Sequence, residues 1–538
     1  MPLSRRSFLS AGLGITVVTA ATSVGVTGYA RADAPGVKGD PFLLGVASGD
    51  PVPDGFVIWT RLALDPLAED GLGGMPNRPV TVQWEVAEDE KMTRVVARGE
   101  ERAVPDSAHS VHVELFGLRP GREYFYRFRT GDHMSAVGRA LTTPSATETA
   151  AALTMAFASC AQYEHGWFTA YRRMAEDNPD LVLHLGDYLY EYTSGGYTSD
   201  TGLVRSLDGP ETVTLANYRQ RHAQYKADAD LQAAHAIAPW LVVWDDHEVD
   251  NNWAGTVPEN TDATQGNDTS ENFLARRAAA FQAYYENMPL RPSSTPTGHD
   301  MKIFRRIRWG TLANFHMLDT RQYRDDQAAG DGWKKNVAER HDEARTLTGT
   351  EQEQWLLDGF RTSTVQWDFL GQQVFFAEQD KDPSPEGDEV SMDGWDGYAA
   401  SRRRITQGLG GFAGTQRRRA HRRRAPALGQ RHQGRLHRSR RAGSGFGTGV
   451  HVDHVERQRH RRDAGRAHGG EPAPEVPQRP ARLRAYHDHP GRRARRLPGA
   501  RHGHRTRRAG VDGGVVRHRV RSAGSAAAFV TSWTVGTR

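Results

Sequence analysis

Two acidic motifs in the middle of the chain carry residue types that could bind metal ions. The first is Gly186-Asp187, and the second, about sixty residues later, is Asp245-Asp246-His247-Glu248. A carboxylate that bridges two cations, flanked by oxygen and nitrogen ligands, allows the ions to activate water and to neutralise phosphoryl oxygens together. Either motif alone could be a solvated turn. Together, they predict a dinuclear metal site that acts on phosphate esters.

Each motif follows a short apolar segment. From residue 152 to 410, such segments alternate with helical stretches, which predicts an α/β domain. Ligands of α/β folds bind beyond the carboxyl ends of strands, so we expect the active site there. The predicted strands at 153–158, 181–185, 241–244 and 315–318 end at Cys160, Asp187, Asp245 and Asp319. We expect Asp319 and the nearby Arg321 to cap their strand end, and we assign them no chemical role. The segment Thr350-Glu-Gln-Glu353 predicts a capping box at a helix start.

Residues 41–145 have a different pattern. Short strands are predicted at 57–60, 80–84, 111–115 and 123–128, separated by turn residues such as Asp54-Gly55. This spacing predicts a small antiparallel β-sandwich of the immunoglobulin or fibronectin kind. A chain of 538 residues is long enough for two such domains.

The first 34 residues predict an export signal. Arg5-Arg6 precedes a weakly apolar run, and small residues around Ala32 and Ala34 are suitable for cleavage. The glycines of the run favour a twin-arginine signal over a membrane anchor. We therefore expect the twin-arginine export machinery as a partner, no stable membrane anchor after cleavage, and a secreted or cell-envelope location.

The composition changes near residue 402. Residues 401–538 contain 34 Arg, no Lys and 7 acidic residues. A basic tail of this kind could bind nucleic acid nonspecifically. Natural basic tails mix Lys with Arg, however, whereas out-of-frame reading of a GC-rich gene yields Arg, Ala, Gly, Pro and His. We therefore interpret residues 411–538 as frame-shifted, with no native domain.

Back-translation of residues 417–429 supports this interpretation. With suitable synonymous codons, reading from the second base gives V-V-V-L-T-G-D-V-H-R-H-W, an apolar strand that ends in a further metal-type motif. The translated chain lacks this motif. We therefore expect it to be unstable and inactive as written, with an exposed edge on its central sheet, whereas the frame-corrected chain is expected to be active.

Several segments between residues 41 and 405 resemble the PhoD-type alkaline phosphatase family. They are residues 157–160 (FASC), 186–191 (GDYLYE), 244–253 (WDDHEVDNNW) and 392–398 (MDGWDGY), with 44–50 (LGVASGD) and 58–61 (IWTR) in the amino-terminal part. The shifted T-G-D-V-H motif resembles the last metal motif of that family. The resemblance implies a metallophosphatase-type four-layer sandwich, with ferric iron (Fe3+) and calcium (Ca2+) as cofactors.

The resemblance also implies iron ligands. Asp187 would bridge the ions, Tyr190 would bind iron as a tyrosinate, and Cys160 would bind it as a thiolate, since both groups suit a trivalent ion. Cys160 is the single cysteine, which excludes an internal disulfide. Without the motif context, Cys160 would be interpreted as a small buried hydrophobic residue, and Tyr190 as a core aromatic.

The remaining implied roles lie in the second motif. Asp246 and Asn252 would bind the second metal or calcium, and Asn251 is an alternative to Asn252. His247 would contact the phosphate, as would Asn252, or protonate the leaving alkoxide as the catalytic acid. Glu248 is expected to contribute only supporting hydrogen bonds.

Taken together, these expectations describe an exported alkaline phosphatase. It would hydrolyse small phosphate monoesters, with diesters as a second substrate class, through attack by a metal-activated hydroxide. The alternatives are a phosphodiesterase or phospholipase-type hydrolase, and a nucleic-acid-binding protein that acts through the Arg-rich tail.

Overall fold

The computed structural model of the protein describes residues 37–200, 202–262, 267–382, 384, 387–409, 516–521 and 529–536. The predicted export signal at 1–34 lies outside the described residues. The same holds for most of the segment 411–538, including the Arg-rich stretch considered for nucleic-acid binding. Within the described ranges, no helix is long and apolar enough to cross a membrane.

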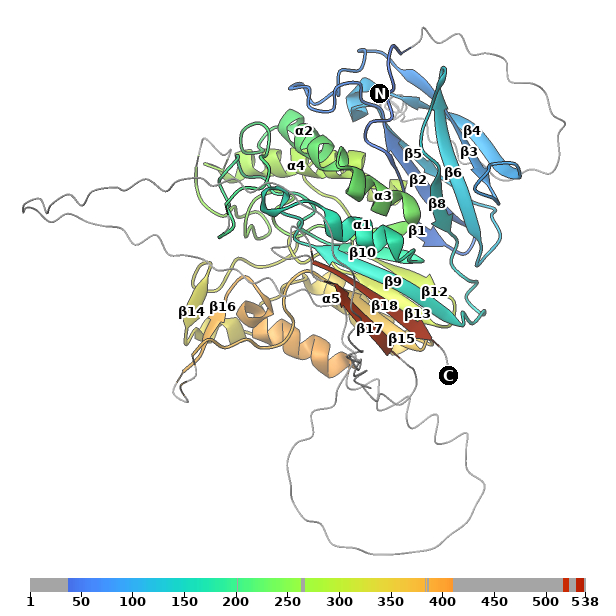
Figure 1. Ribbon diagram of the computed structural model, residues 1–538. Coiled ribbons are helices and arrows are strands. Elements are labelled where there is room, and N and C mark those ends of the chain that lie inside the picture. The colour runs from blue at the N-terminus through green and yellow to red at the C-terminus, as the bar shows by residue number, and fades with distance from the viewer. Residues whose placement is uncertain are drawn as a thin grey trace, which may run out of the picture. The chain divides into compact units, whose positions relative to one another are not determined.

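An eight-stranded mixed sheet forms the centre of the described structure (Figure 1), in the order β17-β18-β9-β10-β11-β1-β2-β5. β9 (Ala152–Ser159), β10 (Leu181–Leu185) and β11 (Pro239–Val243) are parallel neighbours. β10 and β11 are buried along their whole length, as is typical of parallel strands covered on both faces. The carboxyl ends of the three strands meet at one edge, which confirms the predicted clustering of strand ends.

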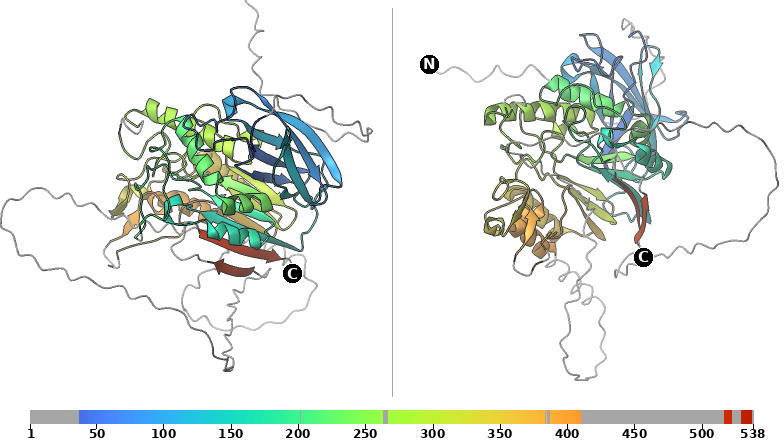
Figure 2. Two further views of the ribbon diagram at one scale, coloured as in Figure 1. Left: turned by 45° about the horizontal axis from the view of Figure 1, so that its top comes forward. Right: turned by 60° about the vertical axis from the view of Figure 1, so that its left-hand side comes forward.

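Four helices lie together on one side of this sheet in Figures 1 and 2. They are α1 (Thr169–Glu176), α2 (Leu215–Lys226), α3 (Ala229–Ile237) and α4 (Ser270–Asn287). Tyr171 of α1 and Phe281 of α4 belong to the same hydrophobic core as Leu183 of β10 and Val242 of β11. The helices therefore bury one face of the strands that carry the two acidic motifs.

A second, three-stranded sheet also packs into this core. Its strands are β12 (Arg305–Trp309), β13 (Ala313–Met317) and β15 (Trp367–Gly371), and a separate pair is formed by β14 (Trp333–Lys335) and β16 (Glu389–Ser391). Ile307, Phe315 and Phe369 join the core cluster of β10 and β11. The described structure is thus a mixed α/β fold, while the four-layer sandwich stays a prediction.

The helix predicted near Thr350 is present as α5 (Thr350–Thr362). The predicted capping box is wrong, because the residue before the helix, Gly349, occupies the cap position and no side chain caps the first turn. Gly349 has a φ of 71°, a conformation that glycine adopts without steric cost. Thr350 is therefore already inside the helix.

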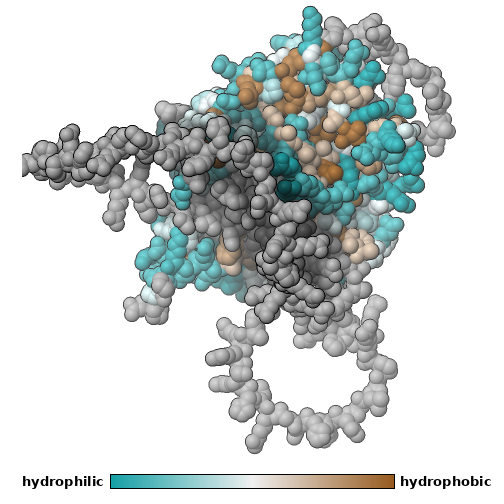
Figure 3. All heavy atoms as spheres, viewed as in Figure 1, coloured by the Kyte–Doolittle hydropathy of each residue, from teal (hydrophilic) through white to brown (hydrophobic). Residues whose placement is uncertain are grey.

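The amino-terminal residues form two facing groups of strands. The first group is β1 (Val46–Val52), β2 (Gly55–Arg61) and β5 (Ser110–Glu114), and the second is β3 (Val80–Ala87), β4 (Val95–Ala103), β6 (Glu123–Thr130), β7 (His133–Met134) and β8 (Gly138–Leu141). Ile58 of the first group and Trp84 and Phe128 of the second share one core. Outside this core, Figure 3 shows hydrophobic side chains in small groups among hydrophilic ones.

The first of these groups is continuous with the central sheet. β1 pairs in parallel with β11, with Ser48 opposite Pro239 and Gly49 opposite Trp240. The two regions that the sequence separates at residues 145–152 therefore share one sheet. The immunoglobulin-like description of the amino-terminal strands stays a prediction.

The other end of the central sheet is occupied by β17 (Val516–Arg521) and β18 (Phe529–Gly536). β18 pairs antiparallel with all of β9, from Ser159 to Ala152. β9 is therefore not an edge of the central sheet, which ends at β17 instead. Strand pairing uses main-chain groups, which any sequence without proline provides. Residues of the segment 411–538 can therefore pair with the sheet despite their unusual composition.

Candidate active site

Unusual backbone conformations mark the candidate site. Cys160, Asp187 and Asn252 have φ angles of 55°, 52° and 49°. Non-glycine residues in the left-handed region cost roughly 1–3 kcal/mol each, and such residues cluster at functional sites. Hydrogen bonds from the Cys160 N–H to the Gly186 carbonyl (3.2 Å) and from the Ala161 N–H to the Asp187 carbonyl (2.8 Å) hold two of these turns together. The strain thus coincides with three predicted site residues.

Gly186 allows the loops after β10 and β11 to approach closely. Its φ is 98°, and a Cβ atom placed on it would lie 2.4 Å from the Asp245 nitrogen. Glu248 joins the same loops, because its carboxylate accepts the backbone N–H groups of Asp187 (3.0 Å), Tyr188 (2.6 Å) and Asp245 (2.8 Å). This agrees with the expected supporting role of Glu248.

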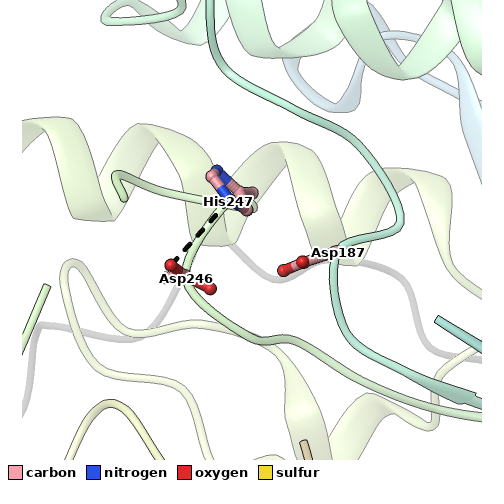
Figure 4. A group of neighbouring side chains, drawn as sticks. All are labelled: Asp187, Asp246 and His247. Carbon is pink, nitrogen blue, oxygen red and sulfur yellow. Dashed lines mark ion pairs between the residues drawn. The ribbon is translucent and has the colours of Figure 1, made fainter. Parts of the chain in front are cut away.

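The two loops bring Asp187, Asp246 and His247 together. One ligand atom from each residue lies within 4.8 Å of the others, and all three residues are at most 2% exposed. Figure 4 shows the Asp187 and Asp246 side chains directed toward the space between the loops, with His247 beside Asp246. The His247 Nε2 atom lies 4.0 Å from Asp246 Oδ2.

The electrostatics of this cluster fit a bound cation. Burial raises the pKa of the Asp187 carboxyl well above its ordinary value; His247 opposes this shift, and Asp246 and Asp245 add to it. Although burial opposes it, the carboxylates of Glu191, Asp246 and Asp187 raise the pKa of His247 well above its ordinary value. Buried carboxylates at such short range repel one another unless positive charge is supplied. The donor set of carboxylates and imidazole therefore suits metal ions.

Tyr190 and Cys160 border the cluster. The Tyr190 hydroxyl donates to Asp187 Oδ2 at 3.0 Å, and Ser159 Oγ donates to Cys160 Sγ at 3.3 Å. Burial raises the pKa of both groups, and the negative charge of Asp187 adds to the shift in each case. Each group must lose its proton to bind a metal, so a nearby trivalent ion would have to reverse these shifts.

The two candidate asparagines have different surroundings. The Asn252 N–H donates to Asp246 Oδ2 (2.8 Å), and its Nδ2 donates to Asp331 Oδ2 (2.7 Å). The Asn251 side chain instead donates to Glu259 Oε1 (2.5 Å). Asn252 thus contacts Asp246 through its main chain, while the side chains of both asparagines bind other carboxylates; which of the two binds metal stays a prediction.

Glu191 is a site residue that sequence reasoning missed. It is fully buried, and its Oε2 lies 2.8 Å from His247 Nδ1. Its Oε1 accepts the Asn251 N–H at 2.9 Å. Because Glu191 binds the Nδ1 atom of His247, the Nε2 atom of the same ring faces Asp246. Its position directly after Tyr190 in the motif was the only sequence signal for this role.

Arg321, to which the sequence analysis assigned no chemical role, also contacts the second acidic motif. It donates to Asp245 Oδ1 at 2.6 Å, lies 3.4 Å from Asp246 Oδ1, and forms two hydrogen bonds with Asp393 (2.7 and 2.8 Å). It thus ties the second acidic motif to the segment 392–398. Asp319 does cap its strand end as expected, since it accepts the N–H groups of Arg321 and Gln322.

Comparisons with known proteins agree with these motifs. A protein-family model described as PhoD-like phosphatase matches residues 155–416. A second family model, described as PhoD-like phosphatase, N-terminal domain, matches residues 28–144. Alkaline phosphatase D of Bacillus subtilis (strain 168) is 51% identical over 406 residues, which cover 74% of this chain and 67% of that protein. A solved structure titled "Structure of PhoD" is 52% identical, with a TM-score of 0.68, and the match covers 70% of this chain and 71% of that one.

Proposed function

Because the chain belongs to the PhoD-like phosphatase family of phosphoric ester hydrolases, we propose that it is an exported, metal-dependent alkaline phosphatase that hydrolyses phosphate monoesters. The observation that carries the metal-dependent site is the convergence of Asp187, Asp246 and His247 beyond the ends of β10 and β11. The export part of the proposal is supported by the twin-arginine pattern of residues 1–34.

Each residue of the cluster has a role in this proposal. Bound cations supply the Lewis acidity that activates water and neutralises phosphoryl oxygens. Asp187 would hold both cations, and Asp246 with Asn252 would bind the second one. His247, oriented by Glu191 through Nδ1, contacts the phosphate and donates a proton to the departing alkoxide from Nε2.

We assign ferric iron to the side of the cluster that holds Cys160 and Tyr190, and calcium to the side with Asp246 and Asn252. The phenol of Tyr190 lies 3.0 Å from Asp187 Oδ2, so one ion could reach both. Iron(III) bound by a phenolate absorbs visible light. The protein purified with iron should therefore be coloured. Tyr190→Phe should weaken and shift the visible band, because the Cys160 thiolate remains as an absorbing ligand; an unchanged band in Tyr190→Phe would contradict this assignment.

We further propose that the chain as written lacks metal ligands that the restored frame supplies after residue 411. The described residues contribute one Asp-Asp-His group to the site, whereas the shifted text adds T-G-D-V-H. Resequencing the codons for residues 400–430 tests this directly. Codons that cannot encode the shifted text would contradict it.

Hydrolysis assays test the function. The chain with its reading frame restored after residue 411 should cleave p-nitrophenyl phosphate in the presence of iron and calcium. In that chain, Asp187→Asn should abolish cleavage and lower the metal content, because a ligand shared by both ions is lost. Bis-p-nitrophenyl phosphate measured in parallel distinguishes a monoesterase from a diesterase. A faster rate on the diester would replace the monoester proposal with the phosphodiesterase alternative.

A further inference from the structure

Aromatic rings continue outward from the cluster of Asp187, Asp246 and His247. The Tyr192 ring lies 5.4 Å from the His247 ring in an edge-on arrangement. The Tyr197 ring stacks near Tyr190, with centroids 5.9 Å apart and planes 25° apart, and it lies 6.0 Å from Tyr192. His165 completes the group, 5.0 Å from Tyr197. We call His165, Tyr192 and Tyr197 the aromatic shelf.

The shelf differs from the catalytic cluster in exposure. Tyr190 and His247 are each 2% exposed, whereas all three shelf residues are only partly buried. Trp167, two residues after His165, is 63% exposed. The shelf residues are therefore partly accessible to solvent, and Tyr192 lies directly beside His247, the residue assigned to the phosphate and the leaving group.

The loop that presents the shelf is held in place. Glu164 is fully buried, and its carboxylate accepts the Ser194 hydroxyl (2.8 Å), the Gly195 N–H (3.0 Å) and the Leu207 N–H (3.0 Å). The His165 Nε2 atom lies 3.0 Å from the Tyr197 carbonyl oxygen. A loop with two adjacent glycines would otherwise be mobile, so these contacts fix the tyrosines before any ligand arrives.

The side chains of the aromatic shelf are uncharged aromatic rings. Burial lowers the pKa of His165, so its ring is uncharged at alkaline pH. Tyrosine and neutral imidazole rings attract planar groups through offset stacking, and they offer no cation for a second phosphate. A planar leaving group fits such a surface better than a short aliphatic alcohol does.

We propose that the aromatic shelf is the subsite for the alcohol portion of the substrate and that it selects phosphate monoesters with a planar ring, such as nucleoside 5′-phosphates. This inference rests on the proposed phosphatase function and adds a substrate class to it. The phosphate binds at the metal cluster, and the base or aryl ring stacks on Tyr197 and Tyr192.

Ligand binding tests the inference without the need for turnover. The chain with its reading frame restored after residue 411, loaded with iron and calcium, is titrated calorimetrically with non-hydrolysable phosphonate analogues of adenosine 5′-monophosphate and of glycerol 3-phosphate. Stacking should make the nucleotide bind roughly 5- to 10-fold more tightly. Tyr197→Leu should remove this difference, whereas Tyr197→Phe, which keeps the ring, should retain it. Phe116→Leu, at a partly buried aromatic that follows β5, serves as the matched control.

The outcomes separate the two proposals. Equal affinity for both ligands in the wild type, or an unchanged difference in both Tyr197→Leu and Tyr192→Leu, would overturn the shelf and leave the phosphate site standing. If neither ligand binds, the phosphate site itself is refuted, together with the inference built on it. Circular dichroism of each variant shows whether the fold is retained, and Tyr192→Leu provides the test if Tyr197→Leu does not fold.

Discussion

Glu191 and Arg321 each lie one contact away from the cluster of Asp187, Asp246 and His247. Glu191 binds the imidazole at Nδ1, and Arg321 contacts Asp245 and Asp246. Partners of this kind orient ligands, and their loss typically lowers metal affinity or activity 10- to 100-fold. The geometry of the centre therefore depends on residues that need not touch the substrate.

Glu191→Gln tests the positioning role at the scale of one residue. The amide keeps the size of the carboxylate but removes the charge that favours a protonated His247, so kcat should fall about 10- to 100-fold while KM changes little. Iron and calcium content, measured by elemental analysis, should stay near the wild-type value. Glu148→Gln, at an exposed glutamate in the linker before β9, is the control.

Two results would count against this role. A loss of metal equal to that of Asp187→Asn would make Glu191 a ligand or a folding residue, and an unchanged kcat would show that His247 needs no orientation. Sequence reasoning could not anticipate the contact, because Glu191 and His247 are 56 residues apart and meet only through the loops after β10 and β11.

At the scale of elements, the positions of the strands were easier to predict from the sequence than the pairing of one strand with another. The apolar runs at 181–185 and 241–244 coincide with β10 and largely with β11, and their polar ends identified Asp187 and Asp246. The pairing of β1 with β11 joins residues about 190 positions apart, and no local pattern encodes it. The cap of α5 was mispredicted because Gly349, rather than Thr350, adopts the nonhelical conformation.

Helix α2 ends in a buried lysine with consequences for pH dependence. Lys226 is 1% exposed; its Nζ lies 3.2 Å from His235 Nε2 and 4.4 Å from the centre of the Trp59 ring. Burial lowers its pKa well below the ordinary 10.5. Between the lowered pKa and 10.5, the unfolded chain binds a proton that the folded chain does not, so stability falls as pH falls.

Lys226→Met should remove this dependence. The variant should be stabilised relative to the wild type, and this advantage should shrink as the pH rises toward 10, by at most about 1.4 kcal/mol per pH unit. Urea unfolding at pH 7, 8 and 9 measures the effect. Lys302→Met, at a lysine whose side chain is 62% exposed, is the control: its free energy of unfolding should change with pH as that of the wild type does. If the free energy of unfolding of Lys226→Met also changes with pH as that of the wild type does, the proposed effect of the buried Lys226 amine on stability is wrong.

At the scale of the whole molecule, the amino-terminal strands and the phosphatase strands share one sheet through β1 and β11, and β17 and β18 close the other end beside β9. β9, which ends beside Cys160, therefore pairs on one side with a strand drawn from the segment that we interpret as frame-shifted. Sequence analysis identified the change in composition at residue 402, but it overlooked residues 529–536 (FVTSWTVG), whose β-branched and aromatic residues favour a strand.

The rate of p-nitrophenyl phosphate hydrolysis, measured with iron and calcium, tests the central claim most directly. Three proteins are compared: the chain with its reading frame restored after residue 411, the same chain carrying Asp187→Asn, and the chain as written. The account predicts rapid hydrolysis by the first, none by the second, and a much slower rate in the third, because metal ligands are missing. A restored chain without hydrolysis, or an Asp187→Asn variant as fast as its parent, would contradict it.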